Sequence, residues 1–202
     1  MTAAVGAAAR GVSAKDRART STVGGVKPPD TMTDGVVVLR KLREGDRAVI
    51  LSTFADPLVR RWLNMPAKPS DADFESVMRT IRTGFESGDR YDYCVTESPN
   101  DEPLGAVIAS RRARDNFELA YLAREAGRGR GLMTRAVRLL SEWLLDAGIG
   151  RLEVRTHPEN EPSQLLAQRA GFHLEGLERK SIWLHGKRED AIVWSRLPTD
   201  PR

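Results

Sequence analysis

Apolar residues recur along this chain with two different periods, and the period changes at turn-forming residues. From Asp71 to Glu86 they recur every three or four residues, which predicts a helix. The same spacing runs from Leu132 to Ala147, where Gly148 ends the predicted helix as a left-handed cap. Shorter apolar or alternating runs predict strands. These strands are Val36–Leu42, Tyr91–Thr96, Leu104–Ser110, Phe117–Leu122 and Leu152–Thr156, followed by a final hairpin of Leu174–Leu184 and Ala191–Leu197.

Three shorter helices complete the predicted order. Asp46 caps one that ends at Asp56, a second is expected over Pro57–Leu63, and a third over Pro162–Arg169. Strands and helices mixed in this order predict an α/β (α+β) domain of three layers. Helices are expected on both faces of a central, mostly antiparallel sheet. The chain contains no internal repeat.

The first 34 residues differ in composition from the rest. They are rich in Ala, Gly, Thr and charge, and have too few large apolar side chains to offset the entropy lost on ordering. We therefore expect a mobile tail at 1–34 and one domain at 35–202, a length that suits a single core. Charged residues interrupt every candidate secretory signal, and no segment approaches the ~20 apolar residues of a membrane span. Met32 is an alternative start to Met1.

The net charge of +4 is divided between the tail and the domain. Residues 1–34 carry five basic and three acidic groups, which leaves 27 basic against 25 acidic groups in the domain. This small excess argues against a nucleic-acid partner. Cys94 is the only cysteine, so neither an internal disulfide nor a cysteine-cluster metal site can form. We expect a cytoplasmic protein with no metal and no membrane partner.

A glycine-rich turn precedes the long helix at 132–147. Gly129 and Gly131 allow the backbone to turn sharply and to approach a ligand closely, because no Cβ is in the way. The helix that follows points its free N–H groups toward an anion. Arg128 and Arg130 add fork-shaped donors suited to phosphate oxygens. The glycine spacing is neither the Rossmann nor the Walker pattern, and a plain strand-to-helix connector remains an alternative.

Two segments together resemble one known family. Residues 128–133 read Arg-x-x-Gly-x-Met, which is similar to the Arg/Gln-x-x-Gly-x-Gly/Ala motif of the GCN5-related N-acetyltransferases (GNAT). Met133 replaces the usual small residue. Residues 160–163 then read Asn-x-x-Ser, and an Ala-Gly-Phe run follows at 170–172, as in the RimJ/RimL-type branch of that family. The resemblance covers nearly all of 36–197.

The resemblance implies a fold, a cofactor and a reaction. In the family the fourth and fifth strands splay into a V that receives the acyl chain of acetyl-CoA, and the glycine loop holds its pyrophosphate. The branch acetylates protein N-termini and small amines. The cofactor-binding residues implied here are Ala120, Tyr121, Leu122, Arg128, Gly129, Arg130, Gly131, Leu132, Met133, Thr134 and Asn160.

The resemblance also points to two catalytic candidates. Glu118 stands on the fourth strand, where several family members place a general base, although a solvent-facing strand carboxylate is an equal alternative. Ser163 stands where this branch is thought to protonate the leaving thiolate, or it is an ordinary helical serine. Many relatives use a tyrosine one turn later, which is Ala167 here. Asn160 is expected mainly to cap its helix, and His157 mainly to have a structural role.

The acceptor is the least determined part of the prediction. An α-amine of a protein or peptide is expected, reached between the early helices and the final hairpin. A metabolite or antibiotic amine is the first alternative, and a non-catalytic acyl-CoA-binding or partner-binding relative is the second. A homodimer is compatible with the resemblance.

Overall fold

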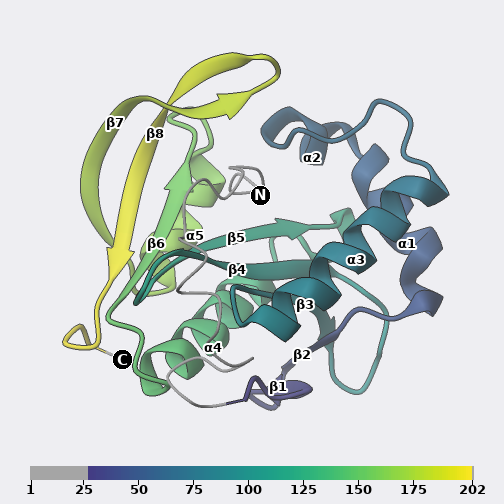
Figure 1. Ribbon diagram of the computed structural model, residues 1–202, viewed down its shortest axis with the longest axis horizontal. Coiled ribbons are helices and arrows are strands. Elements are labelled where there is room, and N and C mark those ends of the chain that lie inside the picture. The colour runs from purple at the N-terminus through teal and green to yellow at the C-terminus, as the bar shows by residue number, and fades with distance from the viewer. Residues whose placement is uncertain (1–26, 202) are drawn as a thin grey trace.

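The computed structural model describes residues 27–201, which form a twisted eight-stranded sheet with helices packed against it (Figure 1). The strand order is β1-β2-β3-β4-β5-β6-β8-β7, and β5–β6 is the one parallel pair among the described strands. The strands are β1 (Thr31–Thr33), β2 (Val37–Lys41), β3 (Arg90–Glu97), β4 (Gly105–Ala113), β5 (Asn116–Ala123), β6 (Arg151–Thr156), β7 (His173–Leu184) and β8 (Lys187–Arg196).

Five α-helices and two 3-10 turns connect the described strands. They are η2 (Glu44–Asp46), α1 (Arg47–Ala55), α2 (Pro57–Trp62), α3 (Asp71–Ser87), η3 (Glu125–Gly127), α4 (Leu132–Asp146) and α5 (Glu161–Arg169). Each predicted helix is present with its ends within a residue or two. Gly148 follows α4 with a φ of 90°, so the predicted left-handed cap is confirmed.

The N-terminal boundary of the domain differs from the prediction. Residues 31–33 form β1, which pairs antiparallel with β2, and the hydroxyl of Tyr93 donates to the carbonyl of Pro29 at 2.7 Å. The domain therefore includes residues that were assigned to the tail at 1–34. The rest of that predicted tail, residues 1–26, lies outside the described part. Because β1 was not predicted, the fourth and fifth predicted strands are β5 and β6 in the structure.

The last hairpin is also longer than predicted. β8 begins at Lys187 rather than at Ala191. Its first residues are charged and mostly exposed, so they carry no apolar alternation that could mark a strand. The tight turn at His185 and Gly186, both with positive φ, brings them back against β7.

Strand alternation sorts the side chains of the sheet onto two faces. On one face, Tyr121 and Val107 pack with Met133 and Val137 of α4 in the main core. On the other face, Leu122 packs with residues of α2. Figure 1 shows α3 crossing in front of the sheet, and the β7–β8 hairpin reaching toward α2 from the opposite side of the molecule. The predicted helices on both faces are therefore confirmed.

The sheet opens between its two central parallel strands. β5 and β6 pair at only three positions, ending with Glu118 opposite Glu153. Beyond that point β5 continues to Ala123 bonded to β4, and β6 continues to Thr156 bonded to β8. The predicted V is thus present, with its vertex at Glu118.

Candidate functional site

The open side of the V leaves backbone groups of β5 without a partner strand. Ala120, Tyr121 and Leu122 pair with β4 on one side, opposite Ile108, Val107 and Ala106. On the other side they have no ladder partner in the described sheet, because β6 has already diverged. A strand edge of this kind can bind an extended amide chain by strand addition. The three predicted residues therefore lie where the chemistry of a pantetheine chain fits.

The glycine turn ends beside this opening and is shaped by two left-handed residues. Gly129 has a φ of 71° and Gly131 a φ of 75°, a region that only glycine enters at little cost. A Cβ added at either position would have no heavy atom within 4 Å, so the space in front of the backbone is open. Gly131 is the N-cap of α4 and offers no side-chain acceptor to the first helical N–H groups. Those groups, at Leu132 to Thr134, are available to an anion.

The two loop arginines are engaged by carboxylates of the protein. Arg128 forms an ion pair with Asp56, and its Nε donates to the carbonyl of Ala123 at 3.1 Å. Arg130 binds Glu97 at 2.6 Å. The predicted phosphate cradle therefore relies first on backbone N–H groups and the helix end. The arginines shape the loop, and their charge is partly neutralised.

Asp56 connects the loop to α2. Its carboxylate accepts hydrogen bonds from the backbone N–H groups of Leu58, at 2.8 Å, and Val59, at 3.4 Å, and so caps the start of that helix. Burial alone would raise the pKa of Asp56, but the hydrogen bonds from Arg128 and the two N–H groups outweigh it and lower the pKa. The carboxylate stays charged and holds Arg128. The first turn of α2 and the glycine turn are thereby joined through one side chain.

Met133 departs from the family motif, and the structure accommodates it. Its side chain is 1% exposed and points into the main core, away from the open side of the loop. The space comes from Gly105 on β4, where an added Cβ would lie 2.8 Å from the Met133 sulfur. A large residue at 133 is therefore compatible with an unobstructed loop.

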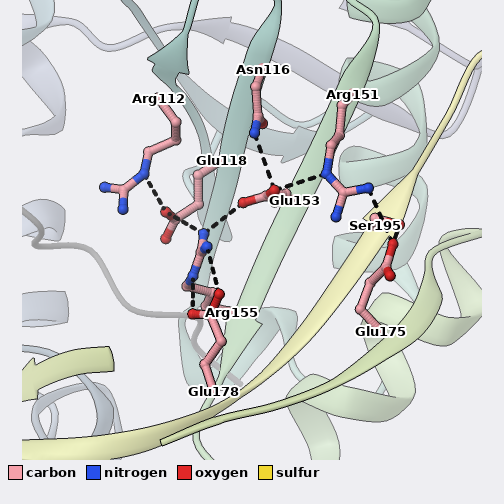
Figure 2. Close-up of polar contacts among 9 residues, drawn as sticks. All are labelled: Arg112, Asn116, Glu118, Arg151, Glu153, Arg155, Glu175, Glu178 and Ser195. Carbon is pink, nitrogen blue, oxygen red and sulfur yellow. Dashed lines mark hydrogen bonds and ion pairs between the residues drawn. The ribbon is translucent and has the colours of Figure 1, made fainter. Parts of the chain in front are cut away.

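Glu118 lies at the vertex of the V, in a network of charged and polar side chains that extends from β4 to β8 (Figure 2). Its Oε2 is 3.2 Å from Arg112 Nε on β4 and 3.2 Å from Arg155 Nη1 on β6. Arg155 also binds Glu153, at 2.8 Å, and Glu178 of β7, at 3.1 Å. The network continues beyond these residues through Asn116, Arg151, Glu175 and Ser195.

Burial raises the pKa of Glu118 above its usual range, and the guanidinium groups of Arg155 and Arg112 act in the opposite direction. The carboxyl side chain is 12% exposed. A carboxylate with a raised pKa is a better proton acceptor than a solvated one. The position and surroundings of Glu118 therefore suit a base that takes a proton from an amine.

Ser163 is fully buried at the start of α5, and its hydroxyl lies 2.9 Å from the Tyr121 hydroxyl. The Tyr121 phenol also donates to the Ser163 carbonyl, at 2.9 Å. When the single phenol proton goes to that carbonyl, the serine hydroxyl is the donor in the pair. Burial raises the pKa of Tyr121, so its proton is retained. Asn160 accepts from the Ser163 N–H at 3.3 Å, which confirms its predicted capping role.

The base candidate and the hydroxyl pair stand on opposite faces of the sheet. Glu118 shares its face with Glu153 and Arg155, whereas Tyr121 is in the core formed with α4 and reaches α5. Continuous sheet would separate the two faces. Only a group within the V can lie between them, so the arrangement suits a reaction in which a base and a proton donor act from opposite sides.

The segment that follows α2 is joined to the turn of the final hairpin. Asn64 Nδ2 donates to the carbonyl of Trp183 at 2.8 Å, and the N–H of His185 donates to Asn64 Oδ1 at 2.8 Å. The ring of Trp62, the last residue of α2, and the ring of His157, which follows β6, lie 5.2 Å apart. His157 Nδ1 accepts from the Glu159 N–H, which supports the predicted structural role. The predicted acceptor route thus lies between two elements that the structure joins.

Neither a metal centre nor a membrane helix is found in the described part of the chain. Residues 27–201 contain no group of three or more His, Cys, Asp or Glu side chains arranged to hold a metal ion. No helix within the same range is long and apolar enough to cross a bilayer.

Two residues of the site and the contact of one side-chain hydroxyl were not predicted. Arg155, Asp56 and the Tyr121 hydroxyl act through partners distant in sequence, from 37 to 72 residues away. Strand parity could have indicated one of them, because residues 118, 153 and 155 share a face once β5 and β6 are aligned in parallel. No local signal marked the other two.

Comparison with known proteins agrees with this geometry. The family model described as the acetyltransferase (GNAT) domain matches residues 37–173. The chain is 30% identical over 120 residues to the Probable N-acetyltransferase YjcK of Bacillus subtilis (strain 168). That match covers 57% of this chain and 66% of the relative, so the chain spans just under two thirds of that protein's length.

Solved structures show the same fold. The ribosomal-protein-S5-alanine acetyltransferase from Vibrio fischeri superimposes with a TM-score of 0.73 at 20% identity, covering 85% of this chain and 98% of that one. RimL, the ribosomal L7/L12 alpha-N-protein acetyltransferase in complex with coenzyme A, superimposes with a TM-score of 0.74 at 18% identity, covering 82% and 96%. The predicted family, fold and acetyl donor are confirmed. This protein belongs to the GNAT family of N-acetyltransferases, the acyltransferases that take their acetyl group from acetyl-CoA.

Proposed function

We propose that this protein acetylates the N-terminal α-amine of a protein or peptide. The observation that carries the proposal is the open V at Glu118, flanked by a buried carboxylate on one face and by the Ser163–Tyr121 hydroxyl pair on the other. Amine acetylation needs both an acceptor for the amine proton and a donor for the departing sulfur. The two faces of the V offer one of each.

Each candidate group has a defined part in the proposed reaction. Acetyl-CoA supplies the thioester, and its diphosphate is bound by the N–H groups of 131–134, with Asn160 at the neighbouring helix start. Glu118 accepts the proton that the amine must lose. The Ser163 hydroxyl turns from Tyr121 to donate its proton to the departing sulfur, and the proton that Glu118 has taken balances the one that Ser163 has lost. Burial, hydrogen bonding and position on the two faces support these roles.

A protein acceptor is supported by the relatives and by the electrostatics of the site. The names of the two solved structures above specify ribosomal proteins as acceptors. The network around Glu118 holds the carboxylates of 118, 153, 175 and 178 against the guanidinium groups of 112, 151 and 155, one negative charge in excess. A single ammonium group balances that charge, whereas a polycationic drug would overcompensate it. We also propose that the reaction takes place in the cytoplasm, where protein thiols such as Cys94 stay reduced.

A panel of amines tests the acceptor. Thiol release from acetyl-CoA would be followed with peptides that differ in their first two residues, beside polyamines, amino acids and an aminoglycoside. Each peptide would also be supplied with a blocked N-terminus and a free lysine, which separates α-amine from side-chain transfer. We expect turnover only with free N-termini. Turnover confined to the small amines would contradict the protein acceptor, and binding of acetyl-CoA without any turnover would favour a non-catalytic relative.

A further inference from the structure

Arg155 is the centre of the ionic network at the vertex of the V (Figure 2). Its guanidinium binds three carboxylates from three strands: Nη1 lies 3.2 Å from Glu118 and 2.8 Å from Glu153, and Nε lies 3.1 Å from Glu178. The side chain is 14% exposed. Because carboxylates bind the planar guanidinium on both sides, the side chain has little conformational freedom left to lose during the reaction.

The position of Arg155 on β6 explains why it can reach Glu118. The last paired residues of β5 and β6 are Glu118 and Glu153, and Arg155 follows two residues later, on the diverging part of the strand. Its side chain points back across the opening to Glu118. The contact therefore bridges the two arms of the V just beyond the vertex, where no backbone ladder remains to fix the carboxylate.

The charged groups that face Glu118 come from the strands on either side of it. Arg112 of β4 approaches at 3.2 Å and Arg155 of β6 at 3.2 Å, while Glu153 of β6 stands beside them. Glu178 of β7 lies on the far side of Arg155. Burial and Glu153 raise the pKa of Glu118, and the two arginines lower it. Removing either arginine leaves the carboxyl with fewer cations and the same burial.

We propose that Arg155 is a positioning residue for the acetyl transfer: it holds the Glu118 carboxylate at the vertex of the V and keeps it charged, so that Glu118 can accept the proton of the amine. The inference rests on the proposed role of Glu118 as the base. A purely structural role, in which Arg155 only joins β6 to β7 through Glu178, is the competing explanation. The two differ in their effect on the pH dependence of the reaction.

The chain offers a matched control in Arg151. This arginine precedes Arg155 by two residues on β6, and it also binds Glu153, at 2.8 Å, and a β7 carboxylate, Glu175, at 3.1 Å. It does not contact Glu118. Loss of either arginine therefore removes similar inter-strand ion pairs, but only the loss of Arg155 removes a cation from Glu118.

The test compares kcat/KM over pH 5 to 9 for Arg155→Met, Arg151→Met and the wild type, with the peptide that is turned over best. Loss of Arg155 should move the acid limb of the profile to higher pH by about one unit, which lowers kcat/KM about tenfold at the acid end. Arg151→Met should leave the limb in place. The Kd for acetyl-CoA should stay within about twofold in both variants, because neither residue lies on the glycine turn.

Two further variants separate this inference from the assignment of Glu118 itself. In a Glu118→Gln background, Arg155→Met should cause no further shift of the limb, because the group that it acts on is absent. Arg155→Lys keeps the charge without the planar fork, so its acid limb should lie between those of the wild type and Arg155→Met, and it serves where Arg155→Met does not fold. An unmoved limb in folded Arg155→Met and Arg155→Lys, or an equal shift in Arg151→Met, would overturn the proposal. A Glu118→Gln enzyme with the wild-type profile would instead remove Glu118 from the mechanism.

Discussion

Gly131 and Gly148 lie at the two ends of α4 and have the same left-handed backbone conformation. Their φ angles are 75° and 90°, and a Cβ added at either would meet no heavy atom within 4 Å. Replacement by alanine therefore introduces left-handed strain without a clash, at a cost of about 1 kcal/mol in each case. For a domain of this size that corresponds to a fall in Tm of about 2–4 °C. Only Gly131 lies on the predicted anion site.

A glutamate at the same two positions separates strain from charge. At 131 its carboxylate would stand within about 6 Å of a bound diphosphate, and with an effective dielectric constant of about 40 the repulsion from two charges is about 3 kcal/mol. We expect Gly131→Glu to weaken acetyl-CoA binding by about a hundredfold. At 148 the same substitution lies a whole helix length away and should change the affinity by less than about twofold, because intervening salt screens the charge.

Titration calorimetry with acetyl-CoA and thermal unfolding measure the two effects on the same four variants. The alanine pair should match in Tm and differ in affinity, and the glutamate pair should differ more strongly in affinity. Binding by Gly131→Glu within threefold of the wild type would refute the assignment of the cradle to the end of α4. Equal weakening by Gly148→Glu would show that the loss comes from the stability of the helix.

Three other predictions concern the hydroxyl pair, a buried ion pair and the hairpin. Ser163→Ala, which leaves the Tyr121 phenol in place, should lower kcat by at least about tenfold while the Kd for acetyl-CoA stays unchanged; an unchanged kcat would contradict the proton-donor role. Asp46→Asn should cost about 2 kcal/mol of unfolding free energy at pH 7, because it breaks the buried ion pair that Asp46 forms with Arg40 at 2.8 Å. Burial alone would raise the pKa of Asp46, but the hydrogen bonds from Arg40 outweigh it and lower the pKa below its usual value. The stabilisation is therefore present above about pH 4 and lost as the pH falls further, so urea melts of the wild type and variant should converge there and not at neutral pH. Asn64→Ala should speed amide hydrogen exchange at the hairpin tip with a loss of only about 1 kcal/mol, and unchanged exchange would show that the tip is held by other contacts.

The fold was predictable because its period signals are strong and local. The amphipathic stripe of α4, the left-handed cap at Gly148 and the alternating strands of the sheet are all readable from neighbouring residues. β1 and the start of β8 were not predicted, because each has few apolar residues and is ordered by its partner strand. Their positions depend on pairing, which no short segment specifies alone.

The candidate site was predictable as far as its backbone. The glycines that set the turn, and the strand that borders the V, follow from residue types at fixed spacing. The side-chain partners do not: Arg128 was expected to bind phosphate, and it is held by Asp56 across 72 residues. Glu118 was expected as a general base or a solvent-facing carboxylate, without a named partner, and it is bound by both Arg112 and Arg155. Such pairings depend on which strands and helices become neighbours in the folded chain.

The carboxylate of Asp56 belongs to a chain of contacts that runs from the glycine turn to the tip of the final hairpin. It fixes the guanidinium of Arg128 beside the glycine turn and the first N–H groups of α2 at the same time. α2 in turn leads to Asn64, which holds the tip of the β7–β8 hairpin. If a ligand bound at one end shifts the contacts at the other, the two binding events are coupled. Thermodynamic reciprocity then requires that acetyl-CoA alter the affinity for the acceptor by the same factor as the acceptor alters the affinity for acetyl-CoA.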